Sequence, residues 1–386
     1  MAPETPAVRL RSIDFLRGLA ALIVALGHAV VAAPYWDVAG KWFEQLCLNI
    51  MWVAVTGVAL FFVVSGFCIH LGQARHGEDG FRFGAFWRRR IRRLYPTYFV
   101  VLCGSMALLL LHWRFGTGQE LLARYADPRG TWLAADFWMH ALMLHGLHPF
   151  FDQAAGNPPL WTLAREEYLY LMYPLLLVAV RRLSWITVAS LLACLTIAID
   201  LVAPAAPRWE LILIRSAPAL WIQWHLGVVA ADAYRGKITL PAFWRQTRWV
   251  PMWILMAYFL PFSAIWLGLG FFTALNACVG VEMAGRWPER GLVDAIARVG
   301  VWSYSLYLVH HPVQTVSLAV TRLVVEDVGV AGFMMRALLL VVISCVAGRV
   351  LFALVERHFV SVRRASRQAP MPSALAQRRE APAVQP

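Results

Sequence analysis

The feature that most constrains this chain is a series of apolar runs, most of them about as long as a helix that crosses a bilayer. Apolar residue types make up 60% of the 386 residues and charged residues 15%. Soluble domains average roughly 45–50% and about 25%. The runs recur with no gap large enough for a soluble domain, so we expect one polytopic membrane domain. The predicted fold is an all-α bundle of about ten transmembrane helices.

The predicted spans alternate with loops of contrasting charge. They cover about 13–34, 48–71, 94–113, 160–180, 184–203, 216–234, two within 249–284, 299–320 and 333–355. A shorter apolar run over 135–150 is interpreted as a re-entrant or interfacial helix. The arginine-rich loops, which carry most of the net charge of +13, fall on one side with both termini. The positive-inside rule therefore predicts cytoplasmic termini.

Domain boundaries and cofactors follow from composition. Residues 1–360 are expected to form the membrane domain, and 361–386, rich in Ala, Pro, Gln and Arg, to be a disordered tail. The six cysteines are scattered without a C-x-x-C pair, so we expect neither a disulfide framework nor a metal site. No cleaved signal peptide is expected, because the first apolar run continues as a full span. The predicted location is the cytoplasmic (inner) membrane, as a multi-pass protein.

The first span carries three ionisable side chains, Asp14, Arg17 and His28. Such groups are costly inside a membrane and by default indicate function. At about 100° per residue, all three fall on one helical stripe, with His28 roughly 16 Å deeper than Arg17. This favours a channel wall with a charged mouth and an imidazole at its far end. The alternative is an interfacial Asp14–Arg17 pair and a packed, hydrogen-bonded His28.

Two further segments place charge at the start of a span. Trp87–Pro96 contains five arginines, which either set topology and attract anionic lipid or dock a polyanion such as coenzyme A. Trp161–Tyr170 contains adjacent Glu166 and Glu167, which point about 100° apart, so that at most one faces a cavity squarely. Interfacial solvation is the alternative for these carboxylates, and which of the two faces a cavity stays open.

Two motifs within apolar helices have a purely structural interpretation as well. Ser65-Gly66 in the second span permits close helix approach. Tyr304, Tyr307 and His311 form a stripe with His310 beside it, and aromatic stripes in membranes often serve packing or the interface.

Together these segments resemble the acyltransferase 3 family, polytopic membrane proteins that acylate carbohydrates and other envelope molecules. The resemblance extends from about Arg9 to His358. The matching motifs, in order, are Arg-x10-His at Arg17 and His28; Phe-Phe-x-x-Ser-Gly-Phe at Phe61 to Phe67; Arg-Arg-x-x-Arg-x-x-Pro at Arg89, Arg90, Arg93 and Pro96; Trp-Ser-Leu-x-x-Glu at Trp161 to Glu166, with Thr162 for Ser; and Ser-Tyr-Ser-x-Tyr-Leu-x-His at Ser303 to His310. The chain departs from the family at Tyr168-Leu169-Tyr170, where Gln-Phe-Tyr is frequent, and at His311, where Trp is frequent; both are expected to alter the acceptor pocket more than the chemistry. No SGNH-type hydrolase domain follows the last span, so we expect the stand-alone form.

The resemblance implies O-acyl transfer from cytoplasmic acyl-CoA, with acetyl-CoA as the expected donor, to a hydroxyl of an envelope carbohydrate or another extracytoplasmic acceptor. An alcohol is a poor nucleophile at neutral pH and needs a base, for which His28 is the candidate. Glu166 would orient or assist His28. The implied site residues are His28, Glu166 and Arg17 for catalysis; Arg17, Arg89, Arg90 and Arg93 for the donor; and Asp14, Ser65, Trp161, Tyr304 and His310 for the substrate pocket.

Other interpretations remain open at the level of sequence. The same ionisable residues would suit a transporter or flippase for an anionic or glycan substrate, which moves its substrate without consuming acyl-CoA. A catalytically inactive scaffold is disfavoured because His28 and the arginine cluster are both present. Acceptor identity, acyl chain length, an acyl-histidine intermediate and oligomeric state are not determined by these patterns.

Overall fold

The structure is a computed structural model that describes residues 9–32, 40–74, 81–114, 131–324 and 329–360, and every regular element in these ranges is helical. The predicted tail at 361–386 lies outside the described residues, as does part of the loop before Phe81. The α-helices are α1 (Arg11–Ala32), α2 (Lys41–Ala74), α3 (Phe83–Arg114), α5 (Thr131–Ala141), α6 (Trp161–Arg182), α7 (Trp185–Val202), α8 (Glu210–Ile214), α9 (Ala217–Tyr234), α10 (Val250–Phe259), α11 (Ser263–Met283), α12 (Gly291–Gly300), α13 (Ser303–Val324) and α14 (Gly329–Leu354). Short 3₁₀ turns join several of them, including Pro158–Leu160 before α6 and Glu356–His358 after α14.

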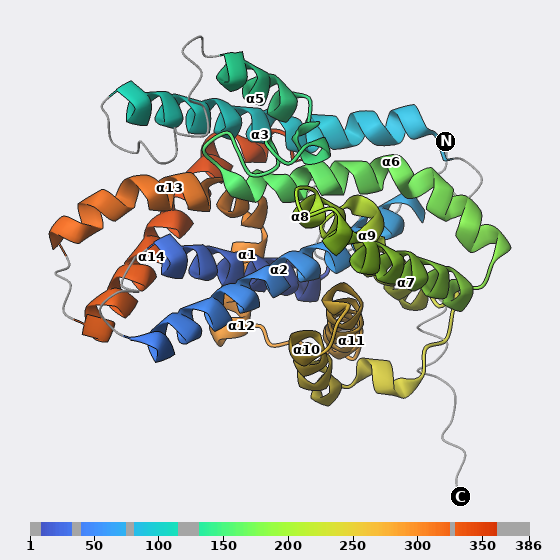
Figure 1. The fold of residues 1–386 in the computed structure, drawn as a ribbon. Coiled ribbons are helices and arrows are strands. Elements are labelled where there is room, and N and C mark those ends of the chain that lie inside the picture. Colours follow the sequence, from blue (N-terminus) through green and yellow to red (C-terminus); the bar gives the residue numbers. More distant parts are fainter. Residues whose placement is uncertain (1–8, 33–39, 75–80, 115–130, 325–328, 361–386) are drawn as a thin grey trace, which may run out of the picture.

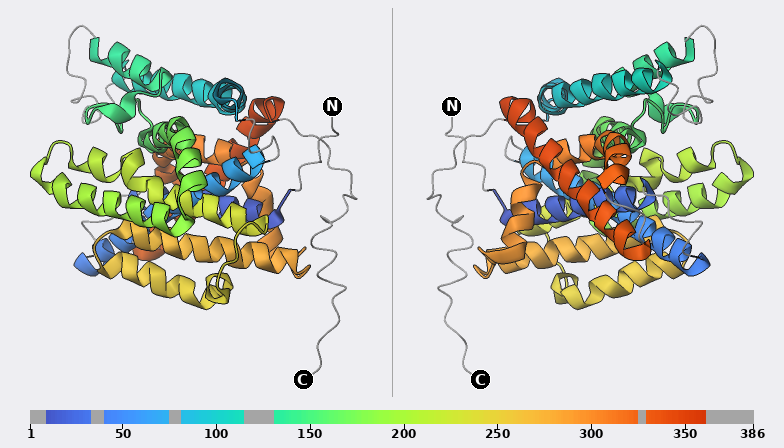
Figure 2. Two further views of the ribbon diagram at one scale, coloured as in Figure 1. Left: turned by 90° about the vertical axis from the view of Figure 1, so that its right-hand side faces the viewer. Right: turned by 90° about the vertical axis from the view of Figure 1, so that its left-hand side faces the viewer.

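Helices α1 and α2 lie side by side through the centre of the molecule (Figure 1). Helices α13 and α14 pack together on one flank of this pair, and α9 packs against α2 on the other, with α7 beyond it. Figure 2 shows α3 and α5 as a layer on one side of the centre and α10 with α11 on the opposite side. The first helix is thus surrounded by other helices, which is why a stripe of ionisable residues on it can be kept away from lipid.

The number of spans is the part of the predicted fold that is not confirmed. In the described part of the chain, six helices are long and apolar enough to cross a membrane, namely α1, α2, α3, α7, α11 and α14 with its 3₁₀ turn. The pair α12 and α13, bent by 81°, makes a seventh if it counts as one broken span. Helix α6 carries too many charged residues to qualify, and α10 has 10 residues, about 15 Å, half of the hydrocarbon thickness.

The outer face of α14 shows the surface expected of a lipid-exposed helix. Leu338, Val342, Val346 and Val350 recur every four residues and are each 50–59% exposed. On the opposite face, Leu340, Ser344 and Gly348 are buried. A continuous exposed apolar stripe is unfavourable in water but matches lipid tails. The multi-pass membrane character predicted from composition is supported by this pattern.

The contact between α2 and α9 depends on two facing glycines. A Cβ added to Gly66 would lie 2.0 Å from the carbonyl oxygen of Trp224, and one added to Gly227 would lie 2.0 Å from that of Val63. The two backbones therefore touch at this point, as small residues permit in membrane helices. The structural interpretation of Ser65-Gly66, that it permits close helix approach, is confirmed. Ser65 also lines a cavity, which is described below.

We predict that Gly66→Ala destabilises the protein while Gly104→Ala does not. The new methyl at Gly66 must push two backbones apart, which costs about 1–3 kcal/mol. Gly104 lies inside α3 with nothing within 4 Å of its would-be Cβ, so alanine there is tolerated or slightly stabilising. Thermal unfolding of the two variants in the same detergent measures the difference. Equal melting temperatures would show that the α2–α9 contact is looser than described.

Candidate active site

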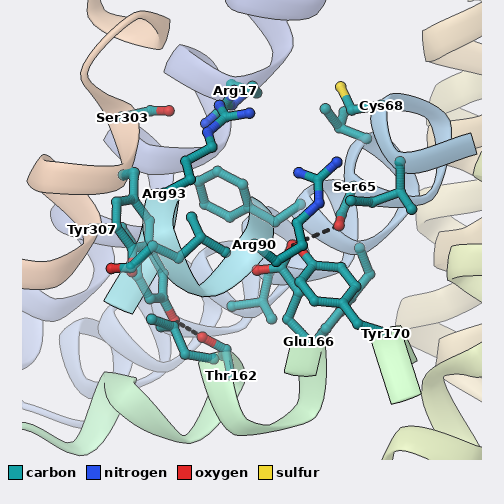
Figure 3. A pocket seen from close by; sticks show the side chains of 18 residues that line it. Arg17, Ser65, Cys68, Arg90, Arg93, Thr162, Glu166, Tyr170, Ser303 and Tyr307 are labelled. Carbon is teal, nitrogen blue, oxygen red and sulfur yellow. Dashed lines mark hydrogen bonds between the residues drawn. The ribbon is translucent and has the colours of Figure 1, made fainter. Parts of the chain in front are cut away.

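A cavity of about 110 Å³ lies where five helices meet, and most of the predicted site residues line it (Figure 3). Helices α1, α2, α3, α6 and α13 contribute its walls. Its polar and ionisable lining residues are Arg17, Ser65, Cys68, Arg90, Arg93, Thr162, Glu166, Tyr170, Ser303, Tyr304 and Tyr307. Residues separated by almost 300 positions in the sequence are therefore brought to one point.

Positive charge dominates one end of this cavity. Arg17 of α1 meets Arg90 and Arg93 of α3, and the only carboxylate in the lining is that of Glu166. None of the three guanidinium groups forms an ion pair with a described residue; Arg90 instead lies over the ring of Tyr170, 5.8 Å from its centroid. Unpaired cations beside a cavity favour an anionic ligand.

Asp14 does not neutralise Arg17, contrary to the structural alternative considered for the first helix. Its carboxylate is 2.5 Å from Nε of Arg9, at the start of α1. Glu356, the other carboxylate within electrostatic range of Arg17 and Arg93, is buried and accepts hydrogen bonds from the backbone N–H and hydroxyl of Ser305. Among the described residues, no carboxylate forms an ion pair with the arginines at this end of the cavity.

The question of which paired glutamate faces the cavity is answered by α6. Glu166 lines it, and its Oε1 accepts hydrogen bonds from the hydroxyls of Ser65, at 2.5 Å, and Tyr170. Glu167 points elsewhere: it is 8% exposed, and its Oε2 has no hydrogen-bond partner among the described residues. The carboxylate of Glu166 is thus fixed by two hydroxyl donors on the wall of the cavity.

The opposite end of the cavity leads to the predicted base. Figure 3 shows Thr162 and Tyr307 at the end away from Arg17, joined by a hydrogen bond of 2.7 Å. The ring of Tyr307 is 5.5 Å from that of His310, which in turn is 4.9 Å from that of His28. His28 is not among the lining residues and is related to the cavity through the ring of His310, which lies between it and Tyr307.

The hydrogen bonding of His28 determines which ring nitrogen is available. Nδ1 is 3.0 Å from the carbonyl oxygen of Val24, one helical turn earlier, and a carbonyl only accepts, so Nδ1 carries the hydrogen. Nε2 then holds the lone pair of the neutral ring. His310 donates from Nδ1 to the carbonyl of Tyr307, and its buried Nε2 has no partner among the described residues. The ring centroid of His311 is 5.8 Å from that of His28.

No hydrogen bond or ion pair connects Glu166 with His28 in the described residues, since the partners of Glu166 are Ser65 and Tyr170. It is the carbonyl of Val24 that orients the imidazole. The described residues also hold no group of three or more His, Cys, Asp and Glu side chains arranged for a metal ion, the histidine cluster included.

Five of the predicted residues do not line the cavity, and two of these, His28 and His310, belong to the histidine cluster described above. The other three are Asp14, Arg89 and Trp161. The ring of Trp161 lies beneath the guanidinium of Arg215, whose Cζ is 4.9 Å from the ring centroid. Arg165, also close to Trp161, is buried and pairs with Asp152 at 2.5 Å. The helical phase explains Arg89: it is one residue from Arg90 and therefore about 100° away around α3.

Sequence reasoning missed Cys68 and Tyr170 as lining residues. Both had a signal, because Cys68 is three residues after Ser65 and Tyr170 is four after Glu166, the spacings that share a helix face. Thr162 was noted only as a departure from a motif, yet its hydroxyl holds Tyr307 at the deep end.

Comparison with known proteins agrees with this arrangement. A family model described as an acyltransferase domain, the acyltransferase 3 model, matches residues 10–354. The chain belongs to the acyltransferase 3 family. It is accordingly a membrane acyltransferase, and the resemblance drawn from its motifs is confirmed. No solved structure gave a significant match.

Several curated relatives of this acyltransferase are also similar in sequence. The acyltransferase MdmB of Streptomyces mycarofaciens is 27% identical over 336 residues, 78% of each chain. A putative peptidoglycan O-acetyltransferase, YrhL of Bacillus subtilis, is 33% identical over 34% of this chain and 21% of its own length. A putative O-acetyltransferase of Staphylococcus aureus (strain COL) is 29% identical over 34% of this chain and 22% of its own length. The matches to the last two thus span about a fifth of those proteins.

We predict that Tyr170→Phe lowers acyl transfer about tenfold, whereas Tyr168→Phe has little effect. Removing the Tyr170 hydroxyl takes away one of two donors to a carboxylate, and such a bond contributes about 1.5–3 kcal/mol. The hydroxyl of Tyr168 donates instead to the carbonyl of Met143, away from the cavity. Label transferred from acyl-labelled acetyl-CoA in membrane vesicles compares the two variants. Equal loss in both would mean that Glu166 is not held for the reaction.

Proposed function

We propose that this acyltransferase moves an acyl group, acetyl in the simplest case, from acyl-CoA to a hydroxyl of an envelope carbohydrate or a similar extracytoplasmic acceptor, with His28 as general base. The protein would act in the cytoplasmic membrane. The observation that carries the proposal is the order of groups along one path: unpaired arginines at one end of the cavity, and Tyr307, His310 and His28 at the other.

The donor suits this path because its charge and its reactive group are at opposite ends. Coenzyme A has phosphates on its nucleotide and a thioester at the tip of a thin, flexible arm. Arg17, Arg90 and Arg93 supply guanidinium groups, which bind phosphate oxygens in bidentate fashion. A cavity of about 110 Å³ is below the usual size of small-molecule pockets, roughly 300–1,000 Å³, but matches an extended arm. The thioester would then reach the end near His28.

The chemistry assigned to His28 follows from its free Nε2. This nitrogen takes the proton of the acceptor hydroxyl as the oxygen attacks the thioester carbonyl. The carbon–sulfur bond then breaks, and the coenzyme thiolate receives the proton from His28. One proton is thus taken and returned, and the imidazole ends neutral. General base catalysis by a histidine typically contributes about 10²- to 10⁴-fold.

The motif implies that Glu166 orients or assists His28, but we assign Glu166 a different role. Its oxygen is bound by Ser65 and Tyr170 beside the arginines, so we assign it to the donor end, where its charge offsets part of theirs. The imidazole of His28 is instead oriented by its hydrogen bond to the carbonyl of Val24. Trp161 and His310 remain candidates for contact with the acceptor.

The acceptor class rests on the names of relatives. The Bacillus subtilis protein is named for peptidoglycan O-acetylation, and the Staphylococcus aureus protein for O-acetylation without a stated acceptor. The MdmB name gives an acyltransferase alone. We therefore propose a carbohydrate hydroxyl as acceptor and leave the particular glycan to mass spectrometry of the labelled product.

Replacing the base should abolish transfer. We predict that His28→Ala loses at least about 100-fold of the acyl transfer rate, because no other side chain takes the hydroxyl proton. The matched control is His358→Ala, an exposed histidine far from the cluster. Inside-out vesicles supplied with acyl-labelled acetyl-CoA measure label in envelope carbohydrate. Full activity of His28→Ala would refute the assigned base, and substrate movement without acetyl-CoA consumption would favour a transporter.

Removing a donor contact should raise KM for acyl-CoA and leave kcat nearly unchanged. We predict about a tenfold higher KM for Arg93→Gln, since one charge-assisted phosphate contact is lost. Arg92→Gln is the matched control, because Arg92 is adjacent in sequence but exposed and outside the cavity lining. Equal KM values for the two variants would place the donor elsewhere.

A further inference from the structure

Two buried hydrogen-bond acceptors on α13, close to the predicted base, have no partner among the described residues. They are Nε2 of His310 and Oε1 of Gln314, and each of these residues is 1% exposed. A buried acceptor that no donor satisfies is unfavourable. A ligand that donates hydrogen bonds is therefore favoured at this point of the molecule.

The orientation of the Gln314 amide is fixed by two neighbouring helices. Its Nε2 donates to the carbonyl oxygen of Ala25 on α1, at 2.9 Å, and to the hydroxyl oxygen of Ser344 on α14, at 3.2 Å. A carbonyl only accepts, and the hydroxyl of Ser344 already donates to the carbonyl of Leu340. Turning the amide over would place oxygen against oxygen, so Oε1 remains an acceptor that points away from both contacts.

His310 and the base itself are acceptors as well. Nδ1 of His310 donates to the carbonyl of Tyr307, so its Nε2 holds a lone pair. The ring of His310 is 4.9 Å from that of His28, whose Nε2 is likewise an acceptor in the neutral ring. Gln314 is four residues after His310, on the same face of α13. Its anchor Ala25 is three residues before His28, a rise of about 4.5 Å.

Gln314 lies on the far side of the histidines from the cavity. Tyr304 and Tyr307 of α13 line the cavity, His310 follows one turn later, and Gln314 is about 6 Å further along the helix axis. With the cytoplasmic N-terminus that the positive-inside rule predicts, this direction leads to the extracytoplasmic side. The acceptor of the acyl group is expected to approach from that side.

The three acceptor atoms favour a ligand with more than one hydroxyl. An alcohol donates a single hydrogen bond, so a hydroxyl that donates to His28 cannot also donate to His310 or Gln314. The carbonyl of a thioester has no hydrogen to donate. A sugar unit has several hydroxyls on one rigid ring and therefore supplies a second donor close to the first.

We propose that Gln314, together with His310, binds a second hydroxyl of the acceptor sugar and thereby presents the first hydroxyl to His28. The inference rests on the proposed function, because it takes a hydroxyl as acceptor and His28 as base. It makes Gln314 a residue that determines acceptor specificity. The preferred acceptor has at least two free hydroxyls on the sugar unit that receives the acyl group.

The test uses the full chain in nanodiscs with acyl-labelled acetyl-CoA and increasing amounts of solubilised envelope carbohydrate. Gln314→Leu should raise KM for the carbohydrate about tenfold and leave KM for acetyl-CoA within about twofold. Thr315→Val is the matched control at the adjacent residue, whose hydroxyl donates to the carbonyl of His311 within α13. It should leave both KM values within about twofold. Ser344→Ala removes one anchor of the amide but keeps Oε1, so it should raise KM for the carbohydrate less than Gln314→Leu does.

The product of the unchanged protein gives a second measurement, which does not depend on how well a variant folds. Mass spectrometry and NMR of the labelled carbohydrate should show a further free hydroxyl on every sugar unit that carries the label. A labelled unit without a second free hydroxyl would overturn the inference.

Failure of the inference can be told apart from failure of the proposed function. In Gln314→Leu, a raised KM for acetyl-CoA with an unchanged KM for the carbohydrate would place an amide of the pantetheine arm at Gln314 and overturn the inference. Unchanged values for both substrates, or an equal effect of Ser344→Ala, would overturn it too, while transfer by the unchanged protein would uphold the proposed function. No transfer of label by the unchanged protein would overturn the proposed function and the inference together.

Discussion

Three guanidinium groups and one carboxylate line the same cavity. The organisation of the site follows from the free energy that is needed to keep these like charges close together. Charges inside a membrane protein are expensive unless they are paired, and like charges in a low-dielectric cavity repel one another. Arg17, Arg90 and Arg93 have no ion-pair partner in the described residues, and Glu166 is already bound by two hydroxyls. A polyanionic ligand would relieve this repulsion, which is consistent with the proposed acyl-CoA donor.

Helix packing makes the cluster possible. Helix α1 is central because its neighbours approach closely, and glycines permit the approach: a Cβ on Gly300 would lie 1.7 Å from the carbonyl oxygen of Asp14. The α2–α9 contact at Gly66 holds Ser65 toward Glu166 in the same way. The contacts that build the site are therefore backbone contacts of large sequence separation. A larger side chain at either glycine would displace residues that line the cavity as well as the helices themselves.

The sequence predicted where helices lie better than it predicted which side chains of different helices are in contact, and the reasons are physical. Apolar length and turn residues located α6 closely, but α3 begins at Phe83 and not near 94, because its arginine-rich first turns continue as an amphipathic helix. Spacing on one helix predicts that Arg17 and a deeper His28 serve one path, and this stays a prediction because His28 does not line the cavity. The same spacing could not show that Glu166 accepts a hydrogen bond from Ser65 and does not contact His28. Contacts between helices depend on how each helix is rotated about its axis, and the pattern of a single helix does not contain that information.

The central claim, that the donor occupies the cavity beside the arginines, has a direct test in a native thiol. Cys68 lines that cavity, whereas Cys278, on α11, does not. The measurement is the rate of N-ethylmaleimide labelling of each cysteine, read by mass spectrometry, with and without a non-hydrolysable thioether analogue of acetyl-CoA. The account predicts that the analogue slows labelling of Cys68 about tenfold or more at saturation and leaves Cys278 unchanged. Equal labelling of Cys68 with and without a saturating, bound analogue would contradict it.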